Sequence, residues 1–445
     1  MNRTPRPTRR RAAYTALVLA TTAAVAVTGP AATSLPTGVT TTASTTASTS
    51  TPVAAPSLFE TVDARSAGTV PRSRIVTGDQ QLVRLAEDRL PTGTGTTRLS
   101  LPGKVGTVRL ARTGQDRETT TWEGTLEGQP MSSFTLVRAG GAWAGSLMTP
   151  GASYSLSSSP RVDADGNPAG HFWTQLGAPP ALGEDGAPAP ARPGTAGSGD
   201  LAAPDARKKK RKTKVTVMYA YTPKAKRQIG SRKALRAAAG VALSQTNRTF
   251  KNSKLKVRVK FKGIVKTKGK VAKNQVTNAF RMYRPRDGNF DNIFKARKRK
   301  KADLVQLFTQ GNAAGFCGGG LIPVTPRDAH PQAGVSSVSL GCLGWLVPTH
   351  EMGHNLGADH IRYRGVTHHS KIRGAYGYIN VRRRYLSVMG YYDPCYARGV
   401  YNCTRMPFFS SPKGKTNGKR RGTKKMHNNS RAVRLVAPRV SRYTR

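Results

Sequence analysis

The chain has 445 residues, of which 37% are apolar and 46 are glycine, a composition close to that of globular proteins. Lysine and arginine total 73 against 22 acidic residues, and the formal charge of +51 excludes an ordinary near-neutral soluble protein. The charge is uneven, because residues 1–206 hold 18 basic and 15 acidic side chains and residues 207–445 hold the other 55 and 7. After Glu184 the only glutamate is Glu351, which predicts a specific use for that residue.

The N-terminus has the pattern of an export signal. Eleven residues rich in arginine precede an apolar stretch that ends in the small residues GPAATS. This order predicts a signal peptide over residues 1–33 and therefore a secreted, extracellular protein. A membrane anchor is the alternative, but threonines dilute a stretch already at the short end for a span. No other run is long and apolar enough, so we expect no transmembrane segment in the mature form, and the export route (Sec or twin-arginine) stays open.

Composition then divides the chain up to the second linker. Residues 34–57 are almost all small or hydroxyl-bearing, which predicts a disordered linker. Residues 58–175 form short runs of roughly alternating apolar and polar residues between turns, which predicts a small β-rich domain. Residues 176–212 are rich in alanine, proline and glycine and end in the basic run RKKKRK, which predicts a flexible linker cut during proteolytic processing. A solvated charged face is the alternative for the basic run.

An ordered α/β domain is predicted over residues 213–445. KVTVMYAYTP, at the start of this region, alternates as a strand does, and apolar residues at 224–250 recur at helical spacing. Two further strands are expected at 257–265 and 302–310, and the second has the nearly continuous apolar run of a buried strand.

Four cysteines lie in this region. An even count in an exported chain suggests two disulfides. Three pairings are open, and we favour Cys317 with Cys342 and Cys395 with Cys403, because the second pair encloses a short loop with its own turn residues. A zinc–cysteine cluster is the competing interpretation, but no Cys-x-x-Cys pair supports it.

The segment HEMGHNLGADH carries the chemistry. On a helix His350 and His354 lie one turn apart on the same face and can reach one metal ion. Glu351 is displaced around the helix, so its carboxylate can take a proton from a water that the metal activates. Gly357 allows a sharp exit from the helix, after which His360 returns as a third ligand. Three imidazoles with one open position predict one catalytic Zn²⁺ rather than a closed structural site.

HEMGHNLGADH resembles the extended motif of the metzincin zinc endopeptidases, and YLSVMGYY at 385–392 is similar to their Met-turn. The likeness is greatest to the reprolysin-like (adamalysin-type) secreted proteases and their bacterial relatives, including the peptidyl-Asp metalloendopeptidases, and covers about residues 214–445. It implies an α/β fold of the α+β metzincin type, with a mixed twisted sheet and an active-site helix. Residues 121–156 are more weakly similar to the propeptide of that family, which implies that the protein is made as an inactive zymogen. The family resemblance implies that the activated enzyme hydrolyses peptide bonds in proteins.

Two further site residues come from the resemblance. Met389 is implied to pack beneath the metal as the Met-turn, although an ordinary core methionine is the simpler interpretation. Tyr391 fits the S-x-M-x-Y form of astacin-like and serralysin-like relatives, which implies a transition-state stabiliser, with a packing tyrosine as the alternative.

The sequence also departs from the family pattern. Reprolysins usually place an aspartate after the third ligand, where this chain has Ile361. No cysteine precedes Cys317, so a cysteine latch for the zymogen is absent, and a latch on the zinc would need another donor, such as Asp163, Asp165 or His171.

Basic clusters such as KARKRKKAD, VRRRY and GKRRGTKK predict attraction to polyanions. Export favours an anionic cell wall or cell surface over nucleic acid as the partner, and a merely solvated charged surface is the alternative. Since most clusters lack aromatic residues, sequence-specific nucleic-acid binding is not expected. A secreted polyanion-binding protein with a vestigial zinc site is the alternative function, and the intact Glu351 argues against it. The scarcity of carboxylates gives no support to a calcium site, whereas it would protect an enzyme that cuts beside acidic residues from digesting itself.

Overall fold

The computed structural model describes residues 57–62, 79–115, 118–159, 170–177, 186–190, 212–311, 317–416 and 418–444. The predicted signal peptide lies outside these residues, as do nearly all of the first linker and of the predicted processing run. Within the described part of the chain, no helix is long and apolar enough to cross a membrane.

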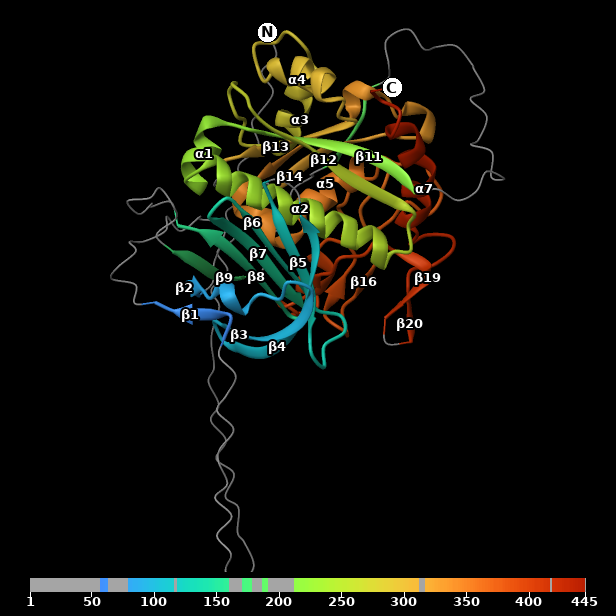
Figure 1. Ribbon diagram of the computed structural model, residues 1–445. Helices are drawn as coiled ribbons and strands as arrows, with labels where there is room; N and C mark the ends of the chain where they lie inside the picture. Colours follow the sequence, from blue (N-terminus) through green and yellow to red (C-terminus); the bar gives the residue numbers. More distant parts are fainter. Residues whose placement is uncertain are drawn as a thin grey trace, which may run out of the picture. The chain divides into compact units, whose positions relative to one another are not determined.

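The predicted β-rich domain is a single antiparallel sheet with the strand order β1-β2-β9-β8-β7-β6-β5-β4-β3 (Figure 1). Its core is aromatic, with Trp122 stacked on Trp143 and Phe59 edge-on to Trp173. The strands are β1 (Phe59–Thr61), β2 (Gln80–Leu85), β3 (Thr94–Leu101), β4 (Lys104–Gln115), β5 (Thr120–Leu126), β6 (Ser133–Ala139), β7 (Ala142–Thr149), β8 (Ala152–Ser158) and β9 (His171–Leu176).

The second sheet is mixed, with the order β10-β14-β15-β13-β11-β12. The neighbours β12, β11, β13 and β15 are parallel, and β14 runs antiparallel to β15. Every residue of β13 is buried, as its continuous apolar run predicts. The strands are β10 (Gly186–Pro188), β11 (Thr213–Tyr221), β12 (Val257–Lys266), β13 (Leu304–Thr309), β14 (Gly318–Ile322) and β15 (Val335–Ser339).

Strand β10 lies inside the region 176–212, which the composition predicts to be a flexible linker. The segment of that region described at 186–190 is paired with β14 in parallel, with Gly186 opposite Gly320. Alanine- and proline-rich composition argues for flexibility only when nothing offers the backbone a hydrogen-bonding partner, and the edge of a sheet offers one.

The long helical pattern at 224–250 is two helices, α1 (Pro223–Ile229) and α2 (Arg232–Asn252). Gly230, with φ of 92°, ends α1, because only glycine adopts this conformation without strain. The Oγ atom of Ser231 then accepts a hydrogen bond from the backbone N–H of Ala234 and caps α2.

Helix α2 also supports the β-rich domain. A small apolar cluster joins Val137 of β6 to Ala237 and Val241 of α2. At Gly240 a Cβ atom would lie 2.7 Å from Val137 Cγ1, so glycine permits this close approach. Gln245 donates a hydrogen bond of 2.7 Å to Ser146 Oγ at the same contact.

The remaining elements are short. They are the 3-10 helices η2 (Glu87–Arg89), η3 (Pro326–Asp328), η4 (Pro331–Ala333) and η5 (Leu340–Trp345), the helices α3 (Gln275–Tyr283), α4 (Asn292–Lys300), α5 (Val347–Asn355), α6 (Asp393–Tyr396) and α7 (Asn429–Val440), and the strands β16 (Ile379–Asn380), β17 (Tyr385–Leu386), β18 (Thr404–Arg405), β19 (Ser411–Thr416) and β20 (Lys419–Arg421). The chain thus mixes helices and sheets, as expected.

Two disulfides hold the segments around α5. Cys317, just before β14, bonds to Cys342 of η5, and Cys395 bonds to Cys403. This is the pairing favoured from the sequence. Described residues include no free cysteine.

Candidate active site

Helix α5 presents the first two predicted ligands. His350 and His354 lie one turn apart and are fully buried. Gly357 then turns the chain with φ of 81°, and a Cβ atom at this position would lie 2.8 Å from Val436 Cγ2. Glycine is therefore required at the turn both by its backbone conformation and by space. His360 follows the turn and faces the two helix histidines.

The three imidazoles converge through one kind of atom. Nε2 of His360 lies 3.2 Å from Nε2 of His350 and 2.9 Å from Nε2 of His354. Tetrahedral zinc with Zn–N bonds of about 2.0–2.1 Å holds its nitrogen ligands about 3.3 Å apart. The spacing therefore fits zinc, and within the described residues this is the single cluster of histidine, cysteine or acidic side chains that could hold a metal.

Backbone carbonyls fix the orientation of the two helix imidazoles. Nδ1 of His350 donates to the carbonyl oxygen of Val388 at 2.7 Å, and Nδ1 of His354 donates to that of Ala358 at 3.0 Å. A carbonyl oxygen only accepts, so the proton is at Nδ1 and the lone pair of Nε2 points to the metal position.

Asp359 positions the third ligand, a role that the sequence analysis did not assign. One carboxylate oxygen accepts the backbone N–H of His360, and the other accepts those of His369 and Ser370, all at 2.8 Å. The side chain is fully buried. The loop after the third ligand therefore folds back on a carboxylate one residue before His360, although Ile361 occupies the place after it. Nδ1 of His368, in the same loop, lies 4.0 Å from Asp359 Oδ1, and His368 is not part of the metal cluster.

Glu351 lies under strand β14. A Cβ atom at Gly318 would be 2.1 Å from Glu351 Oε1, and one at Gly320 would be 3.1 Å from Oε2. On the other face of the strand, a Cβ atom at Gly319 would be 2.3 Å from the backbone nitrogen of Val276. The three glycines let the strand lie directly between α5 and α3.

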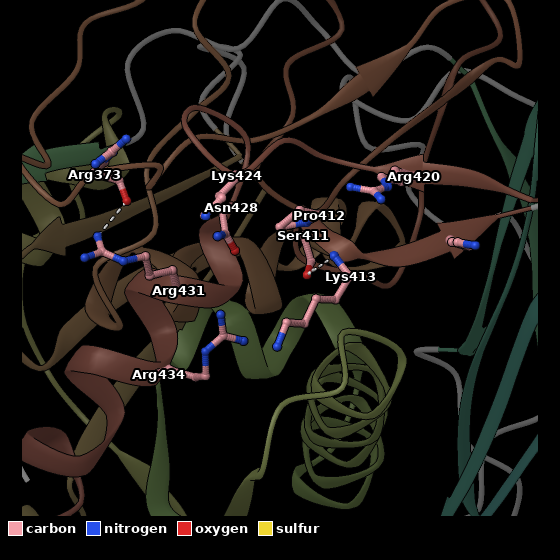
Figure 2. Close-up of a pocket in the computed structure, with 10 residues that line it drawn as sticks. Arg373, Ser411, Pro412, Lys413, Arg420, Lys424, Asn428, Arg431 and Arg434 are labelled. Atoms are coloured by element: carbon pink, nitrogen blue, oxygen red, sulfur yellow. Dashed lines mark hydrogen bonds between the residues drawn. The ribbon is translucent and has the colours of Figure 1, made fainter. Parts of the chain in front are cut away.

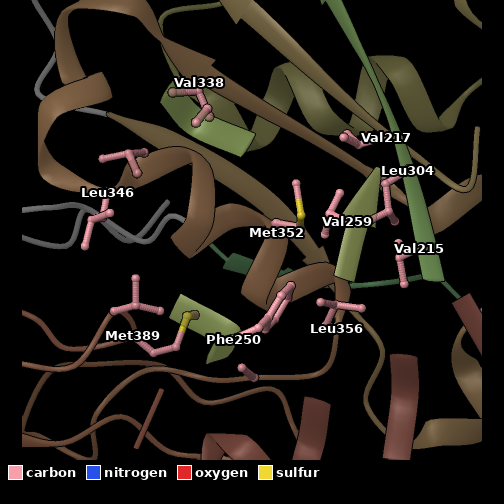
Figure 3. Close-up of a cluster of buried hydrophobic side chains, with 14 of the residues drawn as sticks. Val215, Val217, Phe250, Val259, Leu304, Val338, Leu346, Met352, Leu356 and Met389 are labelled. Carbon is pink, nitrogen blue, oxygen red and sulfur yellow. The ribbon is translucent and has the colours of Figure 1, made fainter. Parts of the chain in front are cut away.

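Met389 contacts helix α5, and Tyr391 contacts His360. A Cβ atom at Gly353 would lie 2.6 Å from Met389 Sδ, so the methionine packs against α5, in the core that also holds Phe250 (Figure 3). The hydroxyl of Tyr391 lies 3.1 Å from both ring nitrogens of His360. Whether the hydroxyl acts on a transition state stays a prediction.

The linker strand β10 also reaches the site. A Cβ atom at Gly186 would lie 3.3 Å from Nε2 of His354 and 2.8 Å from Ile322 Cδ1. By contrast His171, one of the latch donors considered, is in β9 and is not part of the metal cluster. Asp163 and Asp165 lie outside the described residues.

Comparisons with known proteins agree with this chemistry. A family model described as Metallo-peptidase family M12B Reprolysin-like matches residues 237–361, from α2 to just past the third histidine. The match supports a zinc-dependent metallopeptidase. No curated protein matches the sequence.

Two solved structures are similar in outline. One, described as the structure of a chaperone–substrate complex, is 17% identical, with 68% of this chain and 44% of that chain covered and a TM-score of 0.41. The chain therefore spans less than half of that protein. The other, metalloproteinase-II from Bacteroides fragilis, is 11% identical, with 74% and 91% covered and a TM-score of 0.43.

Proposed function

We propose that this chain is a secreted, zinc-dependent endopeptidase of the reprolysin-like metzincin type, made as a zymogen and acting on proteins. The observation that carries the proposal is the convergence of His350, His354 and His360 beside the sole glutamate of the basic region. Zinc bound there would supply Lewis acidity, which acidifies water and polarises the scissile carbonyl.

Glu351 moves the proton in this proposal. It takes a proton from the attacking water as general base and delivers it to the departing amine as general acid. Tyr391 is suited to stabilise charge on the carbonyl oxygen, because its hydroxyl lies beside the ligand ring of His360.

The substrate is proposed to bind as an added strand. Without β10, strand β14 would be the edge of the mixed sheet, with unpaired backbone groups on its outer side. A peptide along this edge passes both Glu351 and His354, since β14 contacts the first and β10 contacts the second.

The position of strand β10 supports the proposal that the protein is made as a zymogen. The strand takes the same edge in the unprocessed chain, and it belongs to the segment that processing near 207–212 would detach. The bound linker and the substrate compete for one set of hydrogen bonds, so the latch is proposed to be steric. Calcium has no role in this proposal.

Casein cleavage by the secreted protein tests the proposal. Glu351→Gln should reduce kcat by about 10²–10⁴-fold, the usual contribution of general acid–base catalysis, because the amide cannot take up a proton. Zinc content should stay at one per chain, and the N-terminus of the active species should lie near 212–215. Asp393→Asn, a carboxylate outside the site, is the matched control. Equal activity of wild type and Glu351→Gln, or full-length protein as the active species, would contradict the proposal.

A further inference from the structure

A second concave region lies between α7, the β19–β20 hairpin and the loops beside them (Figure 2). Its volume is about 760 Å³. Ten residues line it, of which seven are lysine or arginine and none is acidic. It shares no residue with the zinc site, and we call it the basic cavity.

The hairpin contributes one wall. Lys413 and Lys415 are exposed on one face of β19, whereas Gly414 and Thr416 between and beyond them are buried. Lys415 lies directly opposite Arg420 of β20 in the strand register. Like charges placed opposite each other across a strand pair destabilise the pair, so the hairpin alone gives no reason for this arrangement.

Helix α7 contributes the facing wall. Arg431 and Arg434 are three residues apart and therefore neighbours on the helix surface. Partial burial, together with the charge of Arg431, lowers the pKa of Arg434. The first turn of α7 contains no acidic residue, and Arg431 places a positive charge at the end where the helix dipole is already positive.

Neighbouring backbone keeps these charges in place. Nη1 of Arg431 donates a hydrogen bond of 2.9 Å to the carbonyl oxygen of Arg373, another lining residue (Figure 2). Of the ion pairs found in the described residues, none involves a lining residue of the cavity. Three unfavourable placements of positive charge thus face one cavity: the pair across the hairpin, the pair on α7 and the cation at the N-terminal end of α7. A bound anion would reduce the repulsion in all three.

From this convergence we infer that the basic cavity binds a polysaccharide that carries phosphate or sulfate groups. Guanidinium groups match the tetrahedral oxyanion with paired N–H donors, and lysines add point charges. Ser411 and Asn428 are the uncharged polar residues of the lining, and both are nearly buried, so the lysines and arginines supply the contacts. The lining contains no aromatic side chain on which a base could stack, which favours a polysaccharide over nucleic acid.

The test compares two triple variants of the full chain with the same loss of charge. One removes lining charges, Lys413→Gln with Lys415→Gln and Arg431→Gln. The matched control removes exposed charges of α4, Lys295→Gln with Lys298→Gln and Arg299→Gln. The probes are heparin, inorganic sulfate and single-stranded DNA, and binding is measured by calorimetry over a range of salt concentrations.

We expect the cavity variant to bind heparin at least about tenfold more weakly and with a shallower salt dependence, because fewer counterions are displaced. The control variant should stay within about threefold of wild type, and both should unfold cooperatively near the wild-type temperature. Equal weakening in both variants would show that total charge alone is responsible and would overturn the inference. The inference would also be overturned if the cavity variant lost more affinity for single-stranded DNA than for heparin. The same holds if inorganic sulfate bound the wild type as tightly as heparin does. Binding is measured without peptidase activity, so failure of the proposed function leaves this test intact.

Discussion

At the scale of single residues, Asp359 joins three backbone N–H groups of the loop that carries the third ligand. Asp359→Asn leaves one acceptor oxygen where the carboxylate has two, so either the N–H of His360 or those of His369 and Ser370 lose their partner. We expect zinc affinity to fall by about 10–100-fold, as for other partners that hold a ligand in place. Competition with a chelator measures it, with Asp393→Asn as the control. Unchanged affinity would assign Asp359 to folding of the loop only.

His171 predicts a pH dependence of stability. Burial lowers its pKa from 6.5 to about 4, and its Nε2 has no hydrogen-bond partner in the described structure. The unfolded chain therefore takes up the proton first, so the contribution to stability is complete above about pH 6.5 and is lost as the pH falls towards 4. A shift of this size corresponds to about 3 kcal/mol.

Denaturant unfolding of the wild type and His171→Phe at pH 7, 5.5 and 4 checks this prediction. The free energy of unfolding of the wild type should decline more steeply than that of the variant, and the difference should arise below pH 6.5. If the free energies of unfolding of wild type and variant declined in parallel, another group would be responsible for the loss of stability at acid pH.

At the scale of elements, β14 is restricted by what packs against both of its faces. Gly318→Ala puts a methyl group where Glu351 Oε1 now lies, so the carboxylate must move. If Glu351 is the general base, we expect kcat to fall by at least about tenfold with zinc content retained, because misplacing an acid–base group loses much of its contribution. Lys295→Ala, an exposed change on α4 that the mature chain retains, is the control. Activity equal to that of the control would mean that the carboxylate can act from elsewhere.

Elements defined by local spacing were predictable from the sequence. His350, His354 and His360 lie within eleven residues, so helix periodicity and one glycine turn suffice to bring them together. Strands β11, β12 and β13 were predicted from alternation or a continuous apolar run. The break at Gly230 was missed because apolar spacing continues across it, although the pair Gly230–Ser231 is a helix end followed by a cap.

Long-range pairing was not predictable in the same way. β10 is three residues of a proline-rich segment whose partner lies more than 130 residues away. Asp359 gains its role from N–H groups ten residues later, and the basic cavity unites three separate segments. In each case the sequence shows the residue type but not the contact partner that determines its role.

At the scale of the whole molecule, the uneven charge has a structural counterpart. Acidic residues of the β-rich domain meet cations of α2. Glu118 forms an ion pair with Arg236, and Glu123 accepts a hydrogen bond from Ser244. Burial lowers the pKa of Arg248, and the charge of Glu123 offsets part of this effect. The near-neutral front half therefore supplies carboxylates to a basic domain that has few, and separation of the two would leave this face of α2 strongly cationic.

Gly186 links the two halves at the proposed latch. Gly186→Val places side-chain atoms against Ile322 and His354, where a Cβ atom already lies 2.8 Å and 3.2 Å from its nearest neighbours. Overpacking of this kind costs about 1–3 kcal/mol, so the population with β10 displaced should rise by about 5- to 150-fold. With residues 207–211 replaced by glycine and serine to prevent processing, the full-length variant should cleave a fluorogenic peptide correspondingly faster than the full-length wild type.

The processed enzyme is an internal control for this experiment. Residue 186 precedes the proposed cleavage region, so processing with the basic run intact should release the same mature chain from variant and wild type, with equal activity. Equal activity of the two processed enzymes would show that the substitution acts on the latch and not on the catalytic domain. If full-length Gly186→Val stays as inactive as the full-length wild type while both mature forms are active, β10 is not the inhibitory element. The inactivity of the unprocessed chain must then come from a part of the chain outside that strand.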